Sequence, residues 1–339
     1  MKRKTKLLLV VTIVGIIVGG IIGMVRYYSS GQLIPVIPSL FKGILLGGLL
    51  SLWLAFLEQI YLPERLRRFN FLMALLIRTV LYTLSVILVF MVISYAFSYW
   101  MPMEVQLVML APALIITFCI VFLSTFFISL NRLLGARVLF NFFSGRYHHP
   151  REEKRIFLFA DLVSSTTIAE KIGHIQFHKF LRDFLHDVTE PILYSKGEIY
   201  KYVGDEVIVA WFLRDRRINF RCIECCFEME KNLKRKESYY METYGYMPEF
   251  RSGLHCGTVV AGEVGDSKRE IAFLGDVVNT TARIQGEAKV KNRNILVSGD
   301  LINEMELPAD AEVEDMGKIV LKGKLEEVGL FSVRMKQGS

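Results

Sequence analysis

Long runs of apolar residues in the first 130 positions constrain the fold of this chain more than any other feature. The run 7–25 contains no charged residue, and a helix of that length crosses about 30 Å of hydrocarbon. Three further apolar runs of similar or greater length follow before residue 131. We therefore expect residues 1–130 to form a transmembrane domain, a four-helix bundle in the lipid bilayer, with spans at about 7–25, 43–62, 71–100 and 105–130.

The charge distribution separates this part of the chain from the rest. Ten Lys and Arg residues stand against three Asp and Glu residues before position 131, so the whole net charge of +7 lies there. The remaining residues carry equal numbers of acidic and basic side chains, which is typical of a soluble domain. A basic face that binds nucleic acid is therefore not expected.

Basic residues are more numerous on one side of the expected spans than on the other, where the loop 26–42 holds only Arg26 and Lys42. Four precede the first span and three lie in the loop 63–70, whereas residues 98–104 contain none. The positive-inside rule then places both termini and the domain after the last span in the cytoplasm. We expect an integral protein of the cell (inner) membrane. A cleaved signal peptide at Met1–Val25 is the less favoured alternative, because no small-residue cleavage site precedes a polar segment.

Glycines repeat every four residues in the first two expected spans. Gly15, Gly19 and Gly23 share one face of the first span, and Gly43 and Gly47 share one face of the second. Glycine at this spacing lets two helix backbones approach each other closely. The pattern predicts helix packing either within one bundle or between two subunits.

The second part of the chain alternates apolar strands with amphipathic helices, after a linker at residues 131–154. We expect residues 155–335 to form an α+β domain. Its first elements follow the order β-α-β-β-α-β, which predicts a ferredoxin-like core. The expected strands are 155–160, 198–202, 206–212, 250–255, 270–274 and two short ones near Ile295 and Val328, and the expected helices lie within 166–194, 219–244 and 276–288.

Two carboxylates stand at strand ends of this domain. Asp161 ends the first strand and precedes Ser164, Ser165 and Thr166 at a helix start, where free amide groups suit a triphosphate. Asp205 follows a glycine at the tip of the expected hairpin. Alone, each is ordinary helix-cap or turn chemistry. Together at adjacent strand ends, they predict a two-metal site for phosphoryl transfer.

Four motifs follow one another along this domain. They are Phe157-Leu-Phe-Ala-Asp161-Leu-Val-Ser-Ser-Thr166, Lys201-Tyr-Val-Gly-Asp205, Gly253-Leu-His-Cys-Gly257 and Gly275-Asp-Val-Val-Asn279-Thr-Thr-Ala-Arg283. With these motifs, the segment from about residue 155 to residue 333 resembles the class III adenylate and guanylate cyclases. The whole chain resembles their membrane-anchored bacterial members, which implies a cytosolic α+β cyclase domain behind the membrane helices.

The resemblance implies a role for each matching position. Asp161 and Asp205 would hold two divalent ions, Mg²⁺ or Mn²⁺, in each active site. Asn279 would orient the ribose, and Arg283 would contact the phosphates and stabilise the developing charge. Because these last two residues are four apart on one helix, they share a face and reach the same ligand.

Base recognition is the point at which the chain departs from the family pattern. The resemblance implies that Lys201 reads the purine base, which favours ATP. The family's second base-reading position is Ala272 here, and alanine offers no side-chain hydrogen bond. We expect ATP as the substrate, with GTP or a pyrimidine triphosphate left open. Lys324 is a weaker candidate for a triphosphate contact.

These features predict a membrane-bound adenylate cyclase that makes 3′,5′-cyclic AMP and pyrophosphate. The family builds each site from two subunits, so the resemblance implies a homodimer. A catalytically silent membrane receptor with a cyclase-like domain is an alternative, against which the intact motif residues argue. The segment 203–207 also resembles the hairpin of diguanylate cyclases, but Val203 and Val207 break that pattern. A transporter is disfavoured because the spans carry few polar residues.

Overall fold

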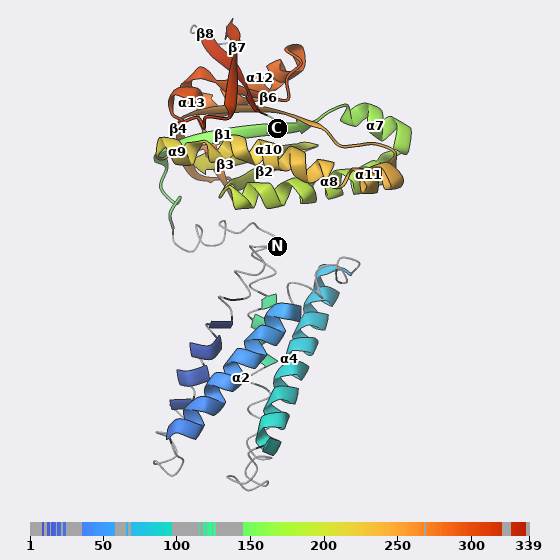
Figure 1. Ribbon diagram of the computed structural model, residues 1–339, viewed down its shortest axis with the longest axis vertical. Helices are drawn as coiled ribbons and strands as arrows, with labels where there is room; N and C mark the ends of the chain where they lie inside the picture. The colour runs from blue at the N-terminus through green and yellow to red at the C-terminus, as the bar shows by residue number, and fades with distance from the viewer. Residues whose placement is uncertain are drawn as a thin grey trace. The chain divides into compact units, whose positions relative to one another are not determined.

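The computed structural model describes residues 36–57, 69–96, 145–267, 269–320 and 327–336, with Leu66 and single residues between 9 and 24 and between 115 and 126. The chain divides into two compact units, Met1–Leu134 and Gly135–Ser339 (Figure 1). This division falls close to the expected boundary between the membrane spans and the rest of the chain.

Two long apolar helices, α2 (Val36–Phe56) and α4 (Phe71–Ala96), pack against each other in the first unit. Helix α2 begins seven residues before the expected second span, with Pro38 in its first turn, where the missing amide hydrogen costs nothing. Within the described residues, Phe71–Leu88 alone is long and apolar enough to cross a membrane, with a mean hydropathy of 2.1, and Gly43–Phe56 is a shorter apolar helix.

Eleven of the nineteen residues in the first expected span, 7–25, are described, and all eleven are helical. Most of the fourth expected span, 105–130, lies outside the described residues, as do the ends of the second and third. The four-helix arrangement therefore stays a prediction. Among the described residues, the one helix long enough to cross a membrane lies within the third expected span.

The repeated glycines pack against each other within this chain. A side-chain carbon added at Gly19 would collide with the carbonyl oxygen of Gly43, and one added at Gly47 would collide with that of Gly15. Only glycine allows two backbones to approach this closely. The glycine pattern allowed packing within one bundle or between two subunits, and in this structure the glycines pack within one chain.

The second unit is built around one mixed sheet. Its strands are β1 (Arg151–Leu162), β2 (Glu198–Val203), β3 (Glu206–Phe212), β4 (Phe250–Val264), β5 (Glu270–Leu274), β6 (Ile295–Ser298), β7 (Ala311–Val320) and β8 (Glu327–Met335). Its helices are α7 (Ser165–Ile172), α8 (His174–Tyr194), α9 (Arg216–Asn219), α10 (Arg221–Lys234), α11 (Glu237–Tyr244), α12 (Asp276–Val290) and α13 (Gly299–Asn303). The strand order is β2-β3-β1-β4-β6-β8-β7, with β5 paired to β4.

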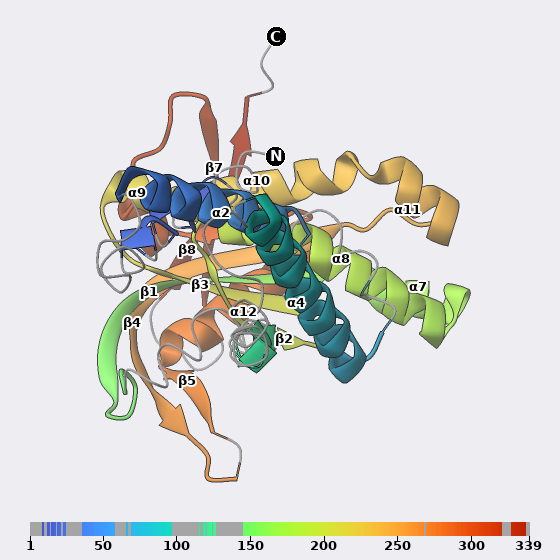
Figure 2. The same cartoon turned by 90° about the horizontal axis from the view of Figure 1, so that it is seen from below.

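The expected βαββαβ core is present in this sheet. Strand β1 lies between β3 and β4 and is antiparallel to both, and β2 is antiparallel to β3. Helices α8 and α10 contact each other on one face, and α12 covers the other (Figure 1 and Figure 2). This arrangement brings the end of β1 and the β2–β3 hairpin to neighbouring positions.

The alternation of side chains along β1 decides which residues reach each face. Ile156 and Leu158 lie in the core beneath α8 and α10, whereas Phe157 and Phe159 lie in the smaller core beneath α12. Because successive strand residues point to opposite faces, Asp161 continues the second series. Asp161 therefore belongs to the face on which α12 lies.

Strands β1 and β4 are longer than expected. Strand β1 begins at Arg151, four residues before the expected start, and β4 continues to Val264 instead of ending near His255. Residues 151–154 pair with residues 258–261, so each extension supplies the hydrogen-bonding partners of the other. The last residues of the expected linker thus belong to the sheet.

Two further differences concern regions with weak local signals. The region 219–244, expected to form a single helix, holds the last residue of α9 and all of α10 and α11, which are separated by short turns. Strand β7 and the short helix α13 were not expected from the sequence. Most side chains of β7 are exposed, so the strand lacks the alternation of polar and apolar residues that would reveal it.

Candidate active site

Asp161 and Asp205 lie within reach of each other, as the sequence predicts. Strands β1 and β3 pair from Arg155 opposite Phe212 to Ala160 opposite Val207, which places the end of β1 beside the β2–β3 turn. Gly204 has a φ of 64° at this turn, a conformation that glycine adopts without strain. Burial, the charge of Asp205 and a hydrogen bond between the two carboxyls raise the pKa of Asp161 to about 6.

A third carboxylate, Glu206, belongs to the same acidic cluster. Burial, followed by the charges of Asp161 and Asp205, raises the pKa of Glu206 to about 7. Glu206 was not among the site residues predicted from the sequence, although its position directly after Asp205 is a signal. Three acids that repel one another at close range form a strongly negative site.

The donor set of this cluster fits divalent ions. Mg²⁺ prefers carboxylate oxygens, and one or two carboxylates commonly hold it together with water and substrate phosphates. Asp161 and Asp205 supply that number. Among the described residues, no three His, Cys, Asp or Glu side chains form a complete cation cage, so the remaining ligands would come from the substrate or from water.

The start of α7, at Ser165, lies four residues after Asp161. Ser164 has left-handed backbone angles, with φ 58° and ψ 28°, and its side chain does not cap the helix that begins at Ser165. Uncapped amides at a helix start attract anions. The predicted group of Ser164, Ser165 and Thr166 therefore offers amide donors beside the carboxylates.

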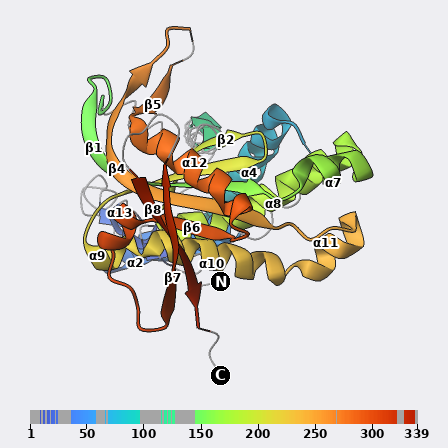
Figure 3. The ribbon, with the colours of Figure 1, turned by 90° about the horizontal axis from the view of Figure 1, so that it is seen from above.

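The two predicted base-reading positions lie on facing strands. Lys201 on β2 donates a hydrogen bond to Glu270 Oε1 on β5 at 2.8 Å, and this bond raises the pKa of Lys201. Ala272 is two residues along β5 and is 9% exposed. The amide of Phe273 donates to the hydroxyl of Tyr200 at 3.3 Å, so β2 and β5 are joined at two points. Figure 3 shows the arm formed by the end of β4 and by β5.

Two glycines of the third motif allow α12 to pack directly on β4. A side-chain carbon at Gly253 would come within 2.8 Å of the α12 backbone, and one at Gly257 would lie 2.6 Å from Val277 Cγ2. The glycines therefore fix the position of α12. That helix presents Asn279, which is exposed, and Arg283, which is half-buried.

Within one chain, the two carboxylates are not bonded directly to the other predicted site residues that the structure describes. Among the residues that the structure describes, no hydrogen bond or ion pair joins Asp161 or Asp205 to Lys201, Asn279 or Arg283. Lys324 lies outside the described residues. The predicted roles of all these residues stay predictions.

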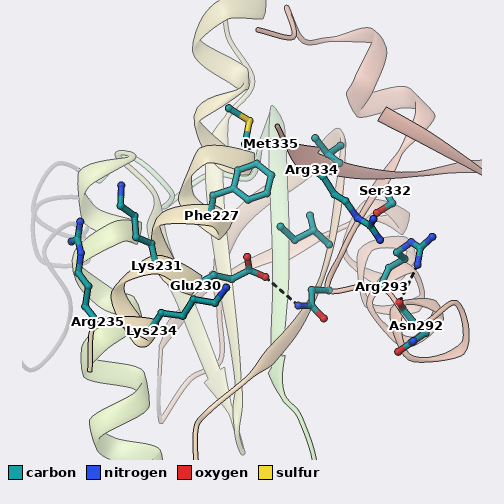
Figure 4. Close-up of a pocket in the computed structure, with 13 residues that line it drawn as sticks. Phe227, Glu230, Lys231, Lys234, Arg235, Asn292, Arg293, Ser332, Arg334 and Met335 are labelled. Carbon is teal, nitrogen blue, oxygen red and sulfur yellow. Dashed lines mark hydrogen bonds between the residues drawn. The ribbon is translucent and has the colours of Figure 1, made fainter. Parts of the chain in front are cut away.

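A pocket of about 770 Å³ lies elsewhere on this unit, and none of the predicted site residues lines it. Figure 4 shows Lys231, Lys234 and Arg235 on one side of it and Arg293 and Arg334 on the other. The pocket is therefore rich in positive charge, whereas the acidic cluster is negative. A divalent cation is suited to the acidic cluster and not to this pocket.

The acidic cluster predicts that Asp161→Asn raises the melting temperature of the metal-free protein at pH 7. The pKa of Asp161 rises from 3.8 to about 6 on folding. Its ionisation therefore costs stability, and this cost grows as the pH rises from about 4 to about 6 and is complete above that. The neutral amide of asparagine at position 161 removes this cost in stability. Thermal unfolding in EDTA at pH 7 and pH 4 measures the effect, which should shrink at pH 4.

Asp310→Asn is the matched control, because Asp310 is exposed and is not part of the cluster. Its melting temperature should follow that of the wild type at both values of pH. Added Mn²⁺ should stabilise the wild type more than Asp161→Asn. A melting temperature of Asp161→Asn at or below the wild-type value at pH 7 would contradict the repulsion.

Comparisons with known proteins bear on the same region. Residues 148–333 match the family of the adenylate and guanylate cyclase catalytic domain. The chain is 34% identical over 208 residues to adenylate cyclase 2 of Rhizobium meliloti (strain 1021), covering 61% of this chain and 57% of that relative. It is 30% identical over 179 residues to the receptor-type guanylate cyclase gcy-7 of Caenorhabditis elegans, covering 51% and 15%. The chain thus spans little more than half of the first relative's length.

Solved structures show the same fold. The adenylyl cyclase CyaB from P. aeruginosa superposes with a TM-score of 0.50 at 20% identity, over 56% of this chain and 97% of that one. A bacterial light-regulated adenylyl cyclase superposes with a TM-score of 0.56 at 20% identity, over 65% of each chain. The family match covers more than half of the chain and includes all four motifs. The chain therefore belongs to the family of adenylate and guanylate cyclase catalytic domains.

Proposed function

We propose that this chain is a membrane-bound adenylate cyclase that converts ATP to 3′,5′-cyclic AMP and pyrophosphate. The observation that carries the proposal is the contact between Asp161 and Asp205 beside the uncapped start of α7. Carboxylates suit metal ions, and helix-start amides suit phosphates. Asp161 and Asp205 would hold two Mg²⁺ or Mn²⁺ ions, which lower the pKa of the ribose 3′-hydroxyl and neutralise phosphate charge when bound.

In this reaction the ribose 3′-oxygen forms a bond to the α-phosphorus and its proton passes to water. The bond from the α-phosphorus to the bridging oxygen breaks, and pyrophosphate leaves with that oxygen. The chain contributes positioning and charge. Asn279 would orient the ribose, and the guanidinium of Arg283 would donate two parallel hydrogen bonds to phosphate oxygens. Amides of residues 164–166 would hold the triphosphate.

The preference for ATP rests on Lys201 and on the strand that it contacts. Its hydrogen bond to Glu270 holds the ammonium group beside β5, which carries Ala272. Lys201 would read the base there. Because Ala272 adds no hydrogen bond, discrimination against GTP depends on Lys201 and on the backbone of β5.

The enzyme is a homodimer embedded in the lipid bilayer. Among the described residues of one chain, no hydrogen bond or ion pair joins the two carboxylates to Lys201, Asn279 or Arg283, which supports a site completed by a second copy. The apolar helices α2 and α4 and the basic residues before position 131 support a membrane anchor with both termini and the catalytic unit in the cytoplasm.

Product identification tests this proposal. The full chain is expressed, and its membrane fraction is supplied with Mn²⁺ and ATP, GTP, CTP or UTP in separate reactions. We expect cyclic AMP as the main product by mass spectrometry, with activity in the membrane fraction. Faster turnover of GTP would contradict the base assignment, and activity confined to the soluble fraction would contradict the anchor.

Replacement of Ala272 by Thr should increase the preference for ATP over GTP by about 1 to 3 kcal/mol, because a hydroxyl there can bond the adenine amine. The measured quantity is the ratio of kcat/KM for the two nucleotides. Ala309→Thr is the control, since Ala309 is exposed in a turn and should leave the ratio unchanged. An unchanged ratio in Ala272→Thr would mean that other groups read this edge of the base.

A further inference from the structure

Arg155 is a charged side chain that is fully buried and has no part in the site described above. It lies on β1, six residues before Asp161, and its side chain is 0% exposed. Its Nε and Nη2 atoms donate to Glu153 Oε2 at 2.9 and 2.6 Å, and Nη1 donates to Glu198 Oε2 at 3.3 Å. Nη2 also donates to the hydroxyl of Tyr147 at 2.9 Å. Burying a charge is costly without such partners, so they fix the guanidinium in one orientation.

One side of this network holds the segment that enters the catalytic unit. Tyr147 is 2% exposed, and its hydroxyl lies 3.3 Å from both carboxylate oxygens of Glu153. Its carbonyl oxygen accepts a hydrogen bond from the amide of Glu263 on β4 at 3.0 Å. The entry segment, residues 146–153, is therefore bonded both to Arg155 and to the arm formed by β4 and β5.

The other side of the network reaches the base-reading strands. The guanidinium carbon lies 3.4 Å from the ring centre of Phe212 and 5.1 Å from that of Phe273. The ring of Phe273 packs edge to face on Tyr200, with 4.9 Å between centres, and the Phe273 amide donates to the Tyr200 hydroxyl. A cation over an aromatic face is attracted to it, so Arg155 holds this aromatic pair in place.

The aromatic pair flanks the two base-reading positions in sequence. Phe273 follows Ala272 directly, and Tyr200 precedes Lys201 directly. Any shift of Phe273 against Tyr200 would change the separation of β5 from β2. The ion pair between Lys201 and Glu270 spans that same separation.

We propose that Arg155 is a positioning residue for base recognition, which sets the spacing of β5 and β2 and couples that spacing to the entry segment. The proposal rests on the proposed function of Lys201 and Ala272. A buried ion pair rarely adds stability compared with well-packed apolar side chains. Its fixed hydrogen bonds instead specify one geometry, and the geometry that Arg155 specifies is that of the base-reading strands.

Steady-state kinetics of Arg155→Lys and Tyr147→Phe, each in the full chain, test this role. Lysine at position 155 keeps the positive charge but lacks the planar guanidinium group with its several donors. Phenylalanine at position 147 lacks the tyrosine hydroxyl. We expect the KM for ATP to rise about tenfold in Arg155→Lys and about threefold in Tyr147→Phe, with kcat changed less than about twofold. The preference for ATP over GTP should fall in the same order.

Arg217→Gln is the matched control, because Arg217 is 79% exposed and forms a surface ion pair with Glu306. Its KM and base preference should equal those of the wild type. If Arg155 had only a structural role, its replacement would lower the melting temperature. The KM for ATP and the base preference of the folded protein would then stay unchanged. That outcome in both variants would overturn the proposal.

Hydrogen exchange at the Phe273 amide gives a second readout that needs no turnover. Exchange should be faster in Arg155→Lys and Tyr147→Phe than in the wild type and Arg217→Gln, because the bond to Tyr200 opens more often. Unchanged exchange in both variants would overturn the coupling. If the wild type makes no cyclic nucleotide, the proposed function fails, while the exchange result still decides whether Arg155 sets the strand spacing.

Discussion

Replacing Asp161 with Ala, or Asp205 with Asn, should lower the rate of cyclic nucleotide formation at least about a hundredfold. Removing one preorganised group that stabilises charge in a transition state costs this much in other enzymes. Here Asp205 lies close enough to Asp161 to help raise its pKa to about 6, and Asp161 precedes the helix start that would hold the triphosphate. Initial rates with ATP and saturating Mn²⁺ measure the loss, which should appear mainly in kcat.

Loss of activity must be separated from loss of folding. Asp161→Asn serves this purpose, because it is expected to be at least as stable as the wild type without metal and yet inactive. Asp310→Asn controls for the loss of one negative charge and should keep normal activity, since Asp310 lies in an exposed turn. Near-normal activity in Asp161→Ala or Asp205→Asn would refute the two-metal site.

The acidic pair could be predicted because both residues follow local signals. Asp161 follows a run of apolar strand residues, and Asp205 follows a glycine in a two-residue turn. Given the βαββ order, strand pairing alone places such residues side by side. Glu206 was missed because it begins strand β3, where its burial depends on how the sheet packs and not on the local sequence.

The partners of Lys201 and Arg155 could not be predicted from local sequence. Glu270 is 69 residues from Lys201, and Glu198 is 43 residues from Arg155. The contact of Lys201 with Glu270 depends on where the arm formed by β4 and β5 lies relative to β2. The contact of Arg155 with Glu198 depends on the order of β1, β3 and β2 in the sheet. The periodicity of apolar residues predicts which face of a helix or strand a residue lies on. It does not predict which residue far away in the sequence that side chain contacts.

Helix boundaries were predicted less well than strand order. The turn between α10 and α11 contains neither glycine nor proline, the two residues that most often mark a break. The sequence therefore predicted one continuous amphipathic helix through this turn. Gly173 separates α7 from α8 with a φ of 81°, a break whose position was not predicted within the region 166–194 assigned to helices.

Co-expression of Asp161→Ala with Asn279→Ala should restore activity to two nearly inactive variants. If each site takes Asp161 and Asp205 from one subunit and Lys201, Asn279 and Arg283 from the other, a mixed dimer carries both lesions in one site and leaves the second intact. Random pairing makes half of the dimers mixed, each with one good site of two. Roughly a quarter of wild-type activity is therefore the ceiling under two-fold symmetry.

The pair Asp161→Ala with Asp205→Asn is the matched control for this experiment. Both lesions then lie in the acidic pair, so each site of a mixed dimer lacks one carboxylate and no rescue should occur. Two different affinity tags purify the mixed dimers in both cases. Rescue in the first combination alone would place the acidic pair and α12 of one site on different subunits. If purified mixed dimers of Asp161→Ala and Asn279→Ala stay as inactive as their parents, the shared site is wrong for this chain.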